Sequence, residues 1–225
     1  MPGPLGRDVR IQPTDFTVGT ETYEGRLNVP GEDTETGVVV LPGAGHGPFG
    51  DVFDVISYEL AGDGKHVVRY DSWENHEQLA QKTFGELHDE INAAIDHLRS
   101  EGCRTFYLLA KSFGGGLALT HVPEAIERVV LWEPAIEITD EAESTPETKV
   151  PTPPDNLTIT EDELGRIGVP VRILCGDEEA GVPVDVCEQI ANALGQGEMT
   201  VIPGENHSFN SNRPAIVEAT VEFFP

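Results

Sequence analysis

The chain has 225 residues, 38% of them hydrophobic, which is enough to bury one sizeable core. Its 40 acidic residues against 14 lysines and arginines give a formal net charge of −26, which repels nucleic-acid phosphates and anionic membranes. No apolar run approaches the roughly 18 residues of a membrane span, and the first ten residues lack the apolar segment of a secretory signal. We therefore expect a soluble, cytoplasmic protein with neither nucleic-acid nor membrane partners.

The acidic residues are spread along the whole chain rather than gathered at one place. This composition resembles that of haloarchaeal cytoplasmic proteins, in which molar salt screens charge repulsion to a length of about 3 Å. We attribute the charge to solvent adaptation and expect the stability to depend on salt. The three cysteines are an odd number without C-x-x-C spacing, so we expect buried thiols and no disulfide or metal site.

Strand-like and helix-like patterns alternate along the chain. Strands are predicted at 17–29, 38–41, 66–70, 104–110, 128–132, 169–175 and 198–202. Helices are predicted at 49–60, 76–100, 112–121, 184–194 and 213–223. This alternation predicts an α/β fold over residues 1–225, a single domain with a mostly parallel central sheet and helices on both faces.

Residues 136–162 interrupt the alternation. The segment is acidic, rich in threonine and proline, and has neither helical nor strand periodicity, so we expect a loop. It follows a strand end at which an active site would lie. It is therefore either a short cap over the pocket or a solvated surface loop.

Ser112 lies where the predicted strand 104–110 meets a helix start rich in small residues. The sequence Ala110-Lys111-Ser112-Phe113-Gly114 sets this serine on a sharp strand-to-helix corner, as in a nucleophile elbow. Such a corner tolerates only small neighbours, which Gly114 and Gly115 provide, while Ala110 stands where the commoner pattern has glycine. Ser112 is the predicted nucleophile.

A serine nucleophile needs a histidine base and an acid that orients the base. His207 lies in the loop after the last predicted strand, which fits the chain order serine, acid, histidine. The loop at 176–183 offers two acids, Glu179, which we place first, and Asp177. Glu133, directly after the strand at 128–132, is the third candidate.

The developing oxyanion needs two backbone donors. We expect them to be the N–H groups of Phe113 and of Ala44, the latter in the glycine-rich loop at 43–47. A phosphate-binding loop is the alternative interpretation of 43–47. It lacks G-x-G-x-x-G spacing, and no P-loop lysine follows it.

Three further residues are candidates for the pocket. Trp73 follows the strand at 66–70 and would either line the acyl pocket or pack beneath a loop. His46 lies in the oxyanion loop and would either contact substrate or face solvent. Lys111 flanks the nucleophile and is one of only four lysines in the chain, which hints at a role near the site.

Four segments in chain order carry a family resemblance: P-G-A-G-H-G, A-K-S-F-G-G, G-D-x-E-x-x-V-P and P-G-x-N-H. Through them the chain resembles the α/β-hydrolase superfamily and is similar to its small dienelactone-hydrolase-like and carboxylesterase-like members, with a minimal cap. Dienelactone hydrolases use a cysteine nucleophile, so with Ser112 their particular substrate does not carry over. The resemblance implies hydrolysis of a small or medium carboxylic ester through an acyl-enzyme on Ser112, with no cofactor or metal.

Two alternatives to an esterase stay open at this point. A thioesterase or peptidase would use the same three residues, because the pocket and not the triad selects the leaving group. A hydrolase-like binding protein without activity would not need the serine, histidine and acid together. The oligomeric state is not predicted.

Overall fold

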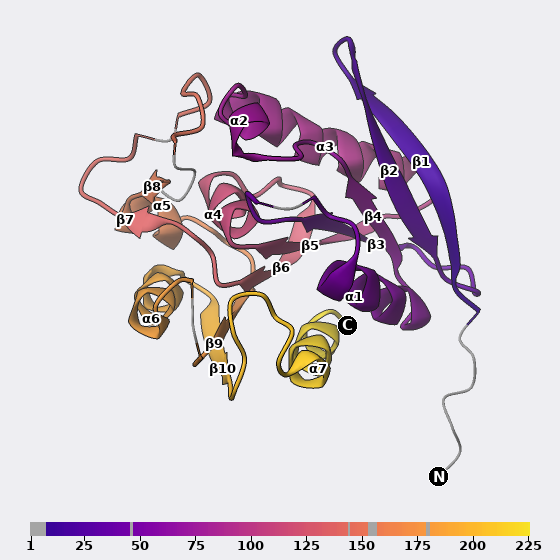
Figure 1. The fold of residues 1–225 in the computed structure, drawn as a ribbon. Helices are drawn as coiled ribbons and strands as arrows, with labels where there is room; N and C mark the ends of the chain where they lie inside the picture. Colours follow the sequence, from indigo (N-terminus) through magenta and orange to yellow (C-terminus); the bar gives the residue numbers. More distant parts are fainter. Residues whose placement is uncertain (1–7, 46, 144, 153–156, 179–180) are drawn as a thin grey trace.

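The computed structural model describes residues 8–45, 47–143, 145–152, 157–178 and 181–225. An eight-stranded sheet crosses the molecule in the order β1-β2-β4-β3-β5-β6-β9-β10 (Figure 1). β1 and β2 form an antiparallel hairpin, β2 is antiparallel to β4, and the remaining neighbours pair in parallel. The structure confirms the predicted mostly parallel sheet.

The strands of this sheet are β1 (Arg10–Val18), β2 (Glu21–Val29), β3 (Thr36–Leu41), β4 (His66–Tyr70), β5 (Thr105–Lys111), β6 (Ile126–Trp132), β9 (Val171–Gly176) and β10 (Gly197–Ile202). The helices are α1 (Asp51–Gly62), α2 (His76–Leu79), α3 (Phe84–Ser100), α4 (Phe113–Thr120), α5 (Glu161–Gly165), α6 (Val184–Ala193) and α7 (Arg213–Phe223).

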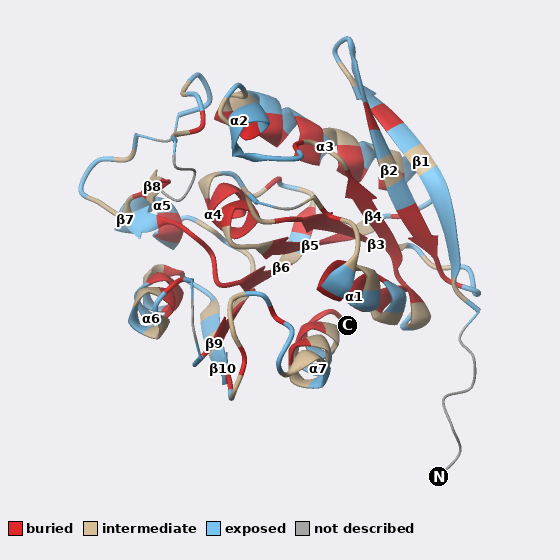
Figure 2. Cartoon of the chain, viewed as in Figure 1, coloured by how far each residue is buried: buried red, intermediate tan, exposed pale blue. Residues whose placement is uncertain are grey.

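Alternate residues of the central strands enter two different cores. On one face, Val38 and Val40 of β3 belong to the core that includes α1 and α7. On the other face, Val39 and Leu41 belong to the core that includes α3, α4 and α6. Strands covered on both faces read as continuous apolar runs, and Figure 2 shows these central strands buried along most of their length.

Two predicted elements are each interrupted in the structure. The single strand predicted at 17–29 is a hairpin, since Gly19 adopts a φ of 59° and reverses the chain between β1 and β2. The helix predicted at 76–100 is two helices, because Thr83 starts α3 with a capping box in which Thr83 and Glu86 bond each other's backbone N–H groups. Buried apolar residues continue from Leu79 of α2 to Phe84 of α3, so the hydrophobic periodicity of the sequence does not reveal the break.

The segment 136–162 contains more regular structure than predicted. Its strands β7 (Glu137–Ile138) and β8 (Thr158–Ile159) pair in parallel, and α5 begins inside it behind a capping box of Thr160 and Glu163. This T-x-x-E signature was present in the sequence and marks the helix start. Within the described part of 136–162, no residue lines the cavity at Ser112, so a cap over that cavity stays a prediction.

His88, on the buried side of α3, is expected to make the fold sensitive to acid. Burial, followed by the nearby His121 ring at 4.7 Å, lowers the pKa of His88 from 6.5 to about 4. The unfolded chain therefore binds a proton that the folded chain refuses, and the stabilisation present above pH 6.5 is lost as the pH falls toward 4. Acidification should therefore lower the free energy of unfolding by about 3 kcal/mol at most through His88. The variant His88→Gln should not show this part of the loss.

Urea unfolding at neutral pH and at about pH 4.5 measures this difference. The exposed His76 supplies the control, since His76→Gln should lose as much stability on acidification as the unaltered chain. Equal losses in His88→Gln and the unaltered chain would contradict the role of His88.

Candidate active site

Ser112 occupies the corner between β5 and α4, as predicted. Its φ of 52° and ψ of −120° lie in a region that residues with a side chain rarely adopt. The backbone N–H of Ser112 donates to the Trp132 carbonyl at 2.8 Å, which ties the corner to the end of β6. At Gly114 a Cβ would lie 2.4 Å from the Pro42 carbonyl oxygen, so only glycine fits there.

His207 is hydrogen-bonded to Glu133. The Nδ1 atom of His207 contacts Oε2 of Glu133, whose side chain is fully buried. An ionised carboxylate only accepts hydrogen bonds, so Nδ1 carries the proton and the neutral ring leaves Nε2 free to take another. This arrangement gives His207 the tautomer that a general base requires.

Glu133 is held rigidly by the neighbouring strand and loop. It follows β6 with a φ of 45°, and its backbone N–H donates to the Leu174 carbonyl of β9 at 3.0 Å. Its carboxylate also accepts the N–H groups of Gly176 at 2.9 Å and of Gly181 at 3.2 Å. With His207, these contacts make three hydrogen bonds that fix the acid in one position.

Of the two loop acids, Asp177 and Glu179, the structure describes Asp177. Asp177 accepts a hydrogen bond from the backbone N–H of Gly204 at 2.6 Å and so stabilises the turn that precedes His207 in the chain. Glu179 lies outside the described residues. The loop at 176–183 thus contributes backbone N–H groups to Glu133, and of the two candidate acids that the structure describes, Glu133 and Asp177, Glu133 is the one bonded to His207.

The loop that carries His207 is organised around a second buried carboxylate, which sequence reasoning missed. Glu205, fully buried, accepts backbone N–H groups from Asn206, Ser211 and Asn212 at 2.8 to 3.0 Å. Three charge-assisted bonds from one loop resist its movement. Its position two residues before His207 was the signal available in the sequence.

The predicted oxyanion loop lies against the nucleophile. A Cβ at Gly43 would be 3.3 Å from the Cβ of Ser112, and Ala44 lines the same cavity as Ser112. The indole Nε1 of Trp73 donates to the Gly43 carbonyl at 3.2 Å, and its ring packs edge-on against Phe113. Of the two alternatives for Trp73, the structure therefore has the one in which it packs beneath the loop.

Arg69, which the sequence analysis did not select, fixes the end of the same loop at Pro48. This fully buried side chain of β4 donates to the Pro48 carbonyl at 3.1 Å and to the Asp54 carboxylate at 2.5 Å. It also donates to Asn28 at 3.2 Å. An arginine within the apolar run at 66–70 was the signal, since a buried guanidinium must be paired.

A cavity of about 660 Å³ brings the predicted residues together. Ser112, Phe113, Ala44 and His207 all line it. His46, predicted to contact substrate, lies outside the described residues. The volume lies within the range typical of small-molecule sites.

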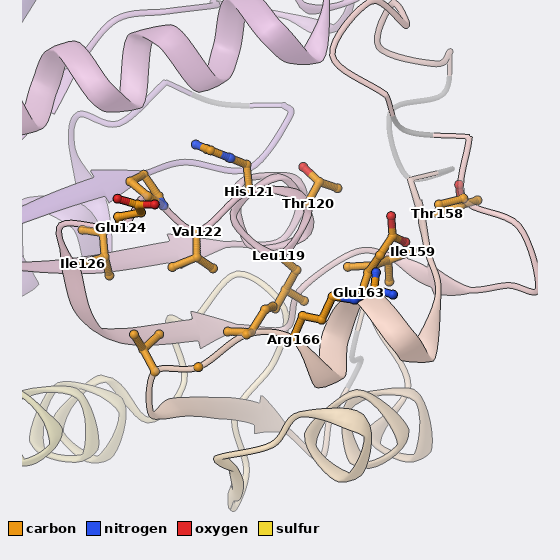
Figure 3. Close-up of a pocket in the computed structure, with 15 residues that line it drawn as sticks. Leu119, Thr120, His121, Val122, Glu124, Ile126, Thr158, Ile159, Glu163 and Arg166 are labelled. Atoms are coloured by element: carbon orange, nitrogen blue, oxygen red, sulfur yellow. The ribbon is translucent and has the colours of Figure 1, made fainter.

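A second cavity, of about 380 Å³, lies at the other end of α4. Figure 3 shows its lining, to which Leu119, Thr120 and His121 contribute where α4 ends and Glu163 and Arg166 contribute from the α5 region. Ser112 precedes the first residue of α4, so the two cavities are separated by the length of this helix, about 12 Å. Ser112 and His207 line the cavity of about 660 Å³ and not this one.

In the described ranges, no group of three or more His, Cys, Asp or Glu side chains could hold a metal ion. Across the same ranges, no helix combines the length and the apolar character needed to cross a membrane.

Comparison with known proteins identifies the fold. No protein-family model matches the sequence, and no curated protein matches it in sequence. Among solved structures, Est1E from Butyrivibrio proteoclasticus is similar with a TM-score of 0.76 and 17% identity, over 94% of this chain and 96% of that one. The dienelactone hydrolase from Anabaena variabilis ATCC 29413 has a TM-score of 0.71 and 18% identity, over 96% and 97% of the two chains.

A third structure agrees with these two. Naproxen esterase (carboxylesterase NP) from Bacillus subtilis has a TM-score of 0.69 and 17% identity, over 97% of this chain and 93% of that one. Similarity at this level of identity is similarity of fold. The chain has the α/β-hydrolase fold, which confirms the predicted fold class.

Gly181 tests how closely the loop at 176–183 packs against the ring of His207. A Cβ at Gly181 would lie 2.5 Å from Cγ of His207, whose ring is held by Glu133 and cannot easily withdraw. Gly181→Ala should therefore displace the ring, which lowers kcat/KM for any ester hydrolysis that uses His207 as the base by about 100-fold, the cost of a misplacement near 1 Å. Steady-state hydrolysis measures the loss. Gly168→Ala is the control, because a Cβ there meets no atom within 4 Å, and equal rates in the two variants would contradict the close fit.

Proposed function

We propose that this chain is a serine hydrolase that cleaves a small or medium carboxylic ester through an acyl-enzyme on Ser112. One observation carries the proposal. Ser112, at a strained strand-to-helix corner, and His207, oriented by the buried Glu133, line the same cavity. A structural neighbour named as an esterase, the naproxen esterase (carboxylesterase NP), supports ester cleavage as the reaction.

In the proposed mechanism the Ser112 hydroxyl attacks the ester carbonyl while Nε2 of His207 takes its proton. Collapse of the tetrahedral intermediate breaks the bond to the alkoxide, which leaves as the alcohol with the proton from His207. Water, deprotonated by His207, then attacks the acyl-enzyme, the bond between the acyl carbon and Oγ of Ser112 breaks, His207 returns the proton to Oγ, and the carboxylic acid leaves. Glu133 keeps Nδ1 protonated throughout and stabilises the imidazolium formed in each half-reaction.

The oxyanion of each tetrahedral intermediate would be bound by backbone N–H groups of Phe113 and Ala44. Phe113 directly follows the nucleophile and begins α4, so the positive end of the helix dipole acts in the same direction. Ala44 lies in the loop supported by Trp73 and Arg69 at its two ends. A preorganised loop stabilises charge without having to rearrange during the reaction.

A fluorophosphonate probe tests for an activated serine independently of the substrate. The purified protein should form one adduct, mapped to Ser112 by mass spectrometry, and His207→Ala should abolish it because the hydroxyl then lacks a base. No adduct on folded protein would contradict the proposal and favour a hydrolase-like protein without activity.

We also propose that the chain works in a concentrated-salt aqueous compartment, the cytoplasm of a halophile. The support is the net charge of −26, because the excess acidic side chains repel one another unless salt screens them. The midpoint of thermal unfolding should rise by about 5 °C or more on raising KCl to about 2 M, which corresponds to roughly 2 kcal/mol for a chain of this size. Sucrose at equal osmolarity is the control, and an equal rise in sucrose would contradict charge screening.

A further inference from the structure

Lys111 presents its ammonium group to the cavity of the nucleophile. It is the last residue of β5, directly before Ser112, and it lines the cavity. A Cβ at Gly43 would lie 3.8 Å from Oγ of Ser112 and 3.9 Å from Nζ of Lys111. The hydroxyl and the ammonium therefore approach the same point of the cavity wall.

The side chain of Lys111 is held in this position by the histidine loop. Its Nζ lies 5.7 Å from the centre of the Phe209 ring, a cation–π contact. Phe209 is fully buried and packs against Trp132 in the core. An ammonium supported in this way is already oriented before a ligand arrives, which lowers the entropy lost on binding.

No carboxylate among the described residues pairs with Lys111. Lys65 and Lys82, by contrast, each have a carboxylate at 2.6 Å. Among the described residues, Glu133 is the acid whose charge acts on Lys111, and its oxygens are already bonded to His207 and to two backbone N–H groups. Burial lowers the pKa of Lys111, and the charge of Glu133 offsets only part of this effect.

The rest of the described cavity lining does not neutralise this charge either. Its single acidic residue is Asp51, which forms an ion pair with Arg213. In a protein with a net charge of −26, acidic side chains are abundant, yet among the described residues no carboxylate forms an ion pair with the ammonium beside Ser112. The missing anion is one that the ligand can supply.

We propose that Lys111 binds a carboxylate carried by the substrate, so that the esters cleaved at Ser112 are anionic ones. The inference rests on the proposed function and narrows its substrate class. The carboxylate can belong to the acyl part or to the alcohol part of the ester, since both parts would lie in the cavity when the carbonyl is at Ser112. An ammonium–carboxylate bond in a partly desolvated site favours the charged ester over an uncharged isostere by about tenfold to hundredfold.

Paired esters that differ only in carboxylate against carboxamide test the inference. For the acyl part the pair is monoethyl glutarate and ethyl glutaramate, and for the alcohol part it is the butyrate esters of 4-hydroxybenzoate and of 4-hydroxybenzamide. The measured quantity is the ratio of kcat/KM within each pair. We expect at least one pair to favour the carboxylate by about tenfold or more, and Lys111→Met to reduce that ratio to about one.

Two further variants show whether the effect belongs to this side chain. Lys111→Arg keeps the charge and should retain part of the preference for the carboxylate. If Lys111 had only a structural role, its replacement would lower kcat/KM for both esters of a pair equally and leave their ratio unchanged. Lys149→Met makes the same change of net charge at an exposed position outside the cavity and should keep the full ratio. A ratio near one in the unaltered protein, or one that persists in Lys111→Met, overturns the inference.

A binding measurement separates this inference from the proposed function. In Ser112→Ala, which cannot form an acyl-enzyme, calorimetry should detect the carboxylate member of the preferred pair about tenfold or more tighter than the carboxamide, and adding Lys111→Met should abolish the difference. Selective binding without hydrolysis by the unaltered protein would contradict the proposed function alone. Hydrolysis of both members with equal efficiency and equal binding would contradict the role of Lys111 alone.

Discussion

Replacing Ser112 by alanine is expected to lower kcat for ester hydrolysis by about 10⁴-fold or more, because the proposed mechanism forms a covalent bond to its Oγ. The residual rate would come from the oxyanion donors and from substrate binding, which the substitution leaves in place. Single-turnover and steady-state hydrolysis of an aryl ester, corrected for the spontaneous reaction, measure the loss.

The control for this prediction is the other serine of the same cavity. Ser208 lines it beside His207 but lies on the histidine loop rather than at the elbow. Ser208→Ala should change kcat by less than about tenfold, since it removes neither nucleophile nor base. If Ser112→Ala kept a substantial share of the activity, the hydrolysis would not proceed through this serine, and the assignment of the cavity would be wrong.

The sequence allowed the elbow to be predicted because its signal is local. An apolar strand, a serine and consecutive glycines occupy neighbouring positions, and the structure has the corner with its positive φ at Ser112. The strand at 66–70 was likewise predicted with its observed bounds. Such features depend on residues close in sequence, so one chain is enough to find them.

The acid could not be chosen in the same way, because its position depends on tertiary register. Trp132 of β6 pairs with Leu174 of β9, and this register brings Glu133 beside the loop that follows β9. Chain order does not discriminate, since Glu133, Asp177 and Glu179 all lie between the serine and the histidine. Motif spacing favoured the loop acids, whereas the path of the loop turns its N–H groups toward Glu133.

Glu133→Gln is expected to lower kcat by about 10³-fold to 10⁴-fold, with little change in KM. The amide has nearly the same shape, but its NH₂ can donate to Nδ1 and thereby favour the tautomer with the proton on Nε2. A ring in that tautomer cannot accept the proton of Ser112. The loss should therefore appear in the chemical step and in the labelling rate with a fluorophosphonate, while circular dichroism confirms that the variant is folded.

Matched variants of the two competing acids make this prediction decisive. Asp177→Asn replaces a carboxylate that accepts a hydrogen bond from the backbone of Gly204 and not from His207. Glu179→Gln replaces the acid that the sequence spacing favoured. Both should keep kcat within about tenfold of the unaltered protein. Glu133→Asp should fall between the extremes, because the carboxylate keeps its charge but loses the reach that the Nδ1 contact uses. A large loss in Glu179→Gln with activity preserved in Glu133→Gln would return the role of the acid to the loop at 176–183.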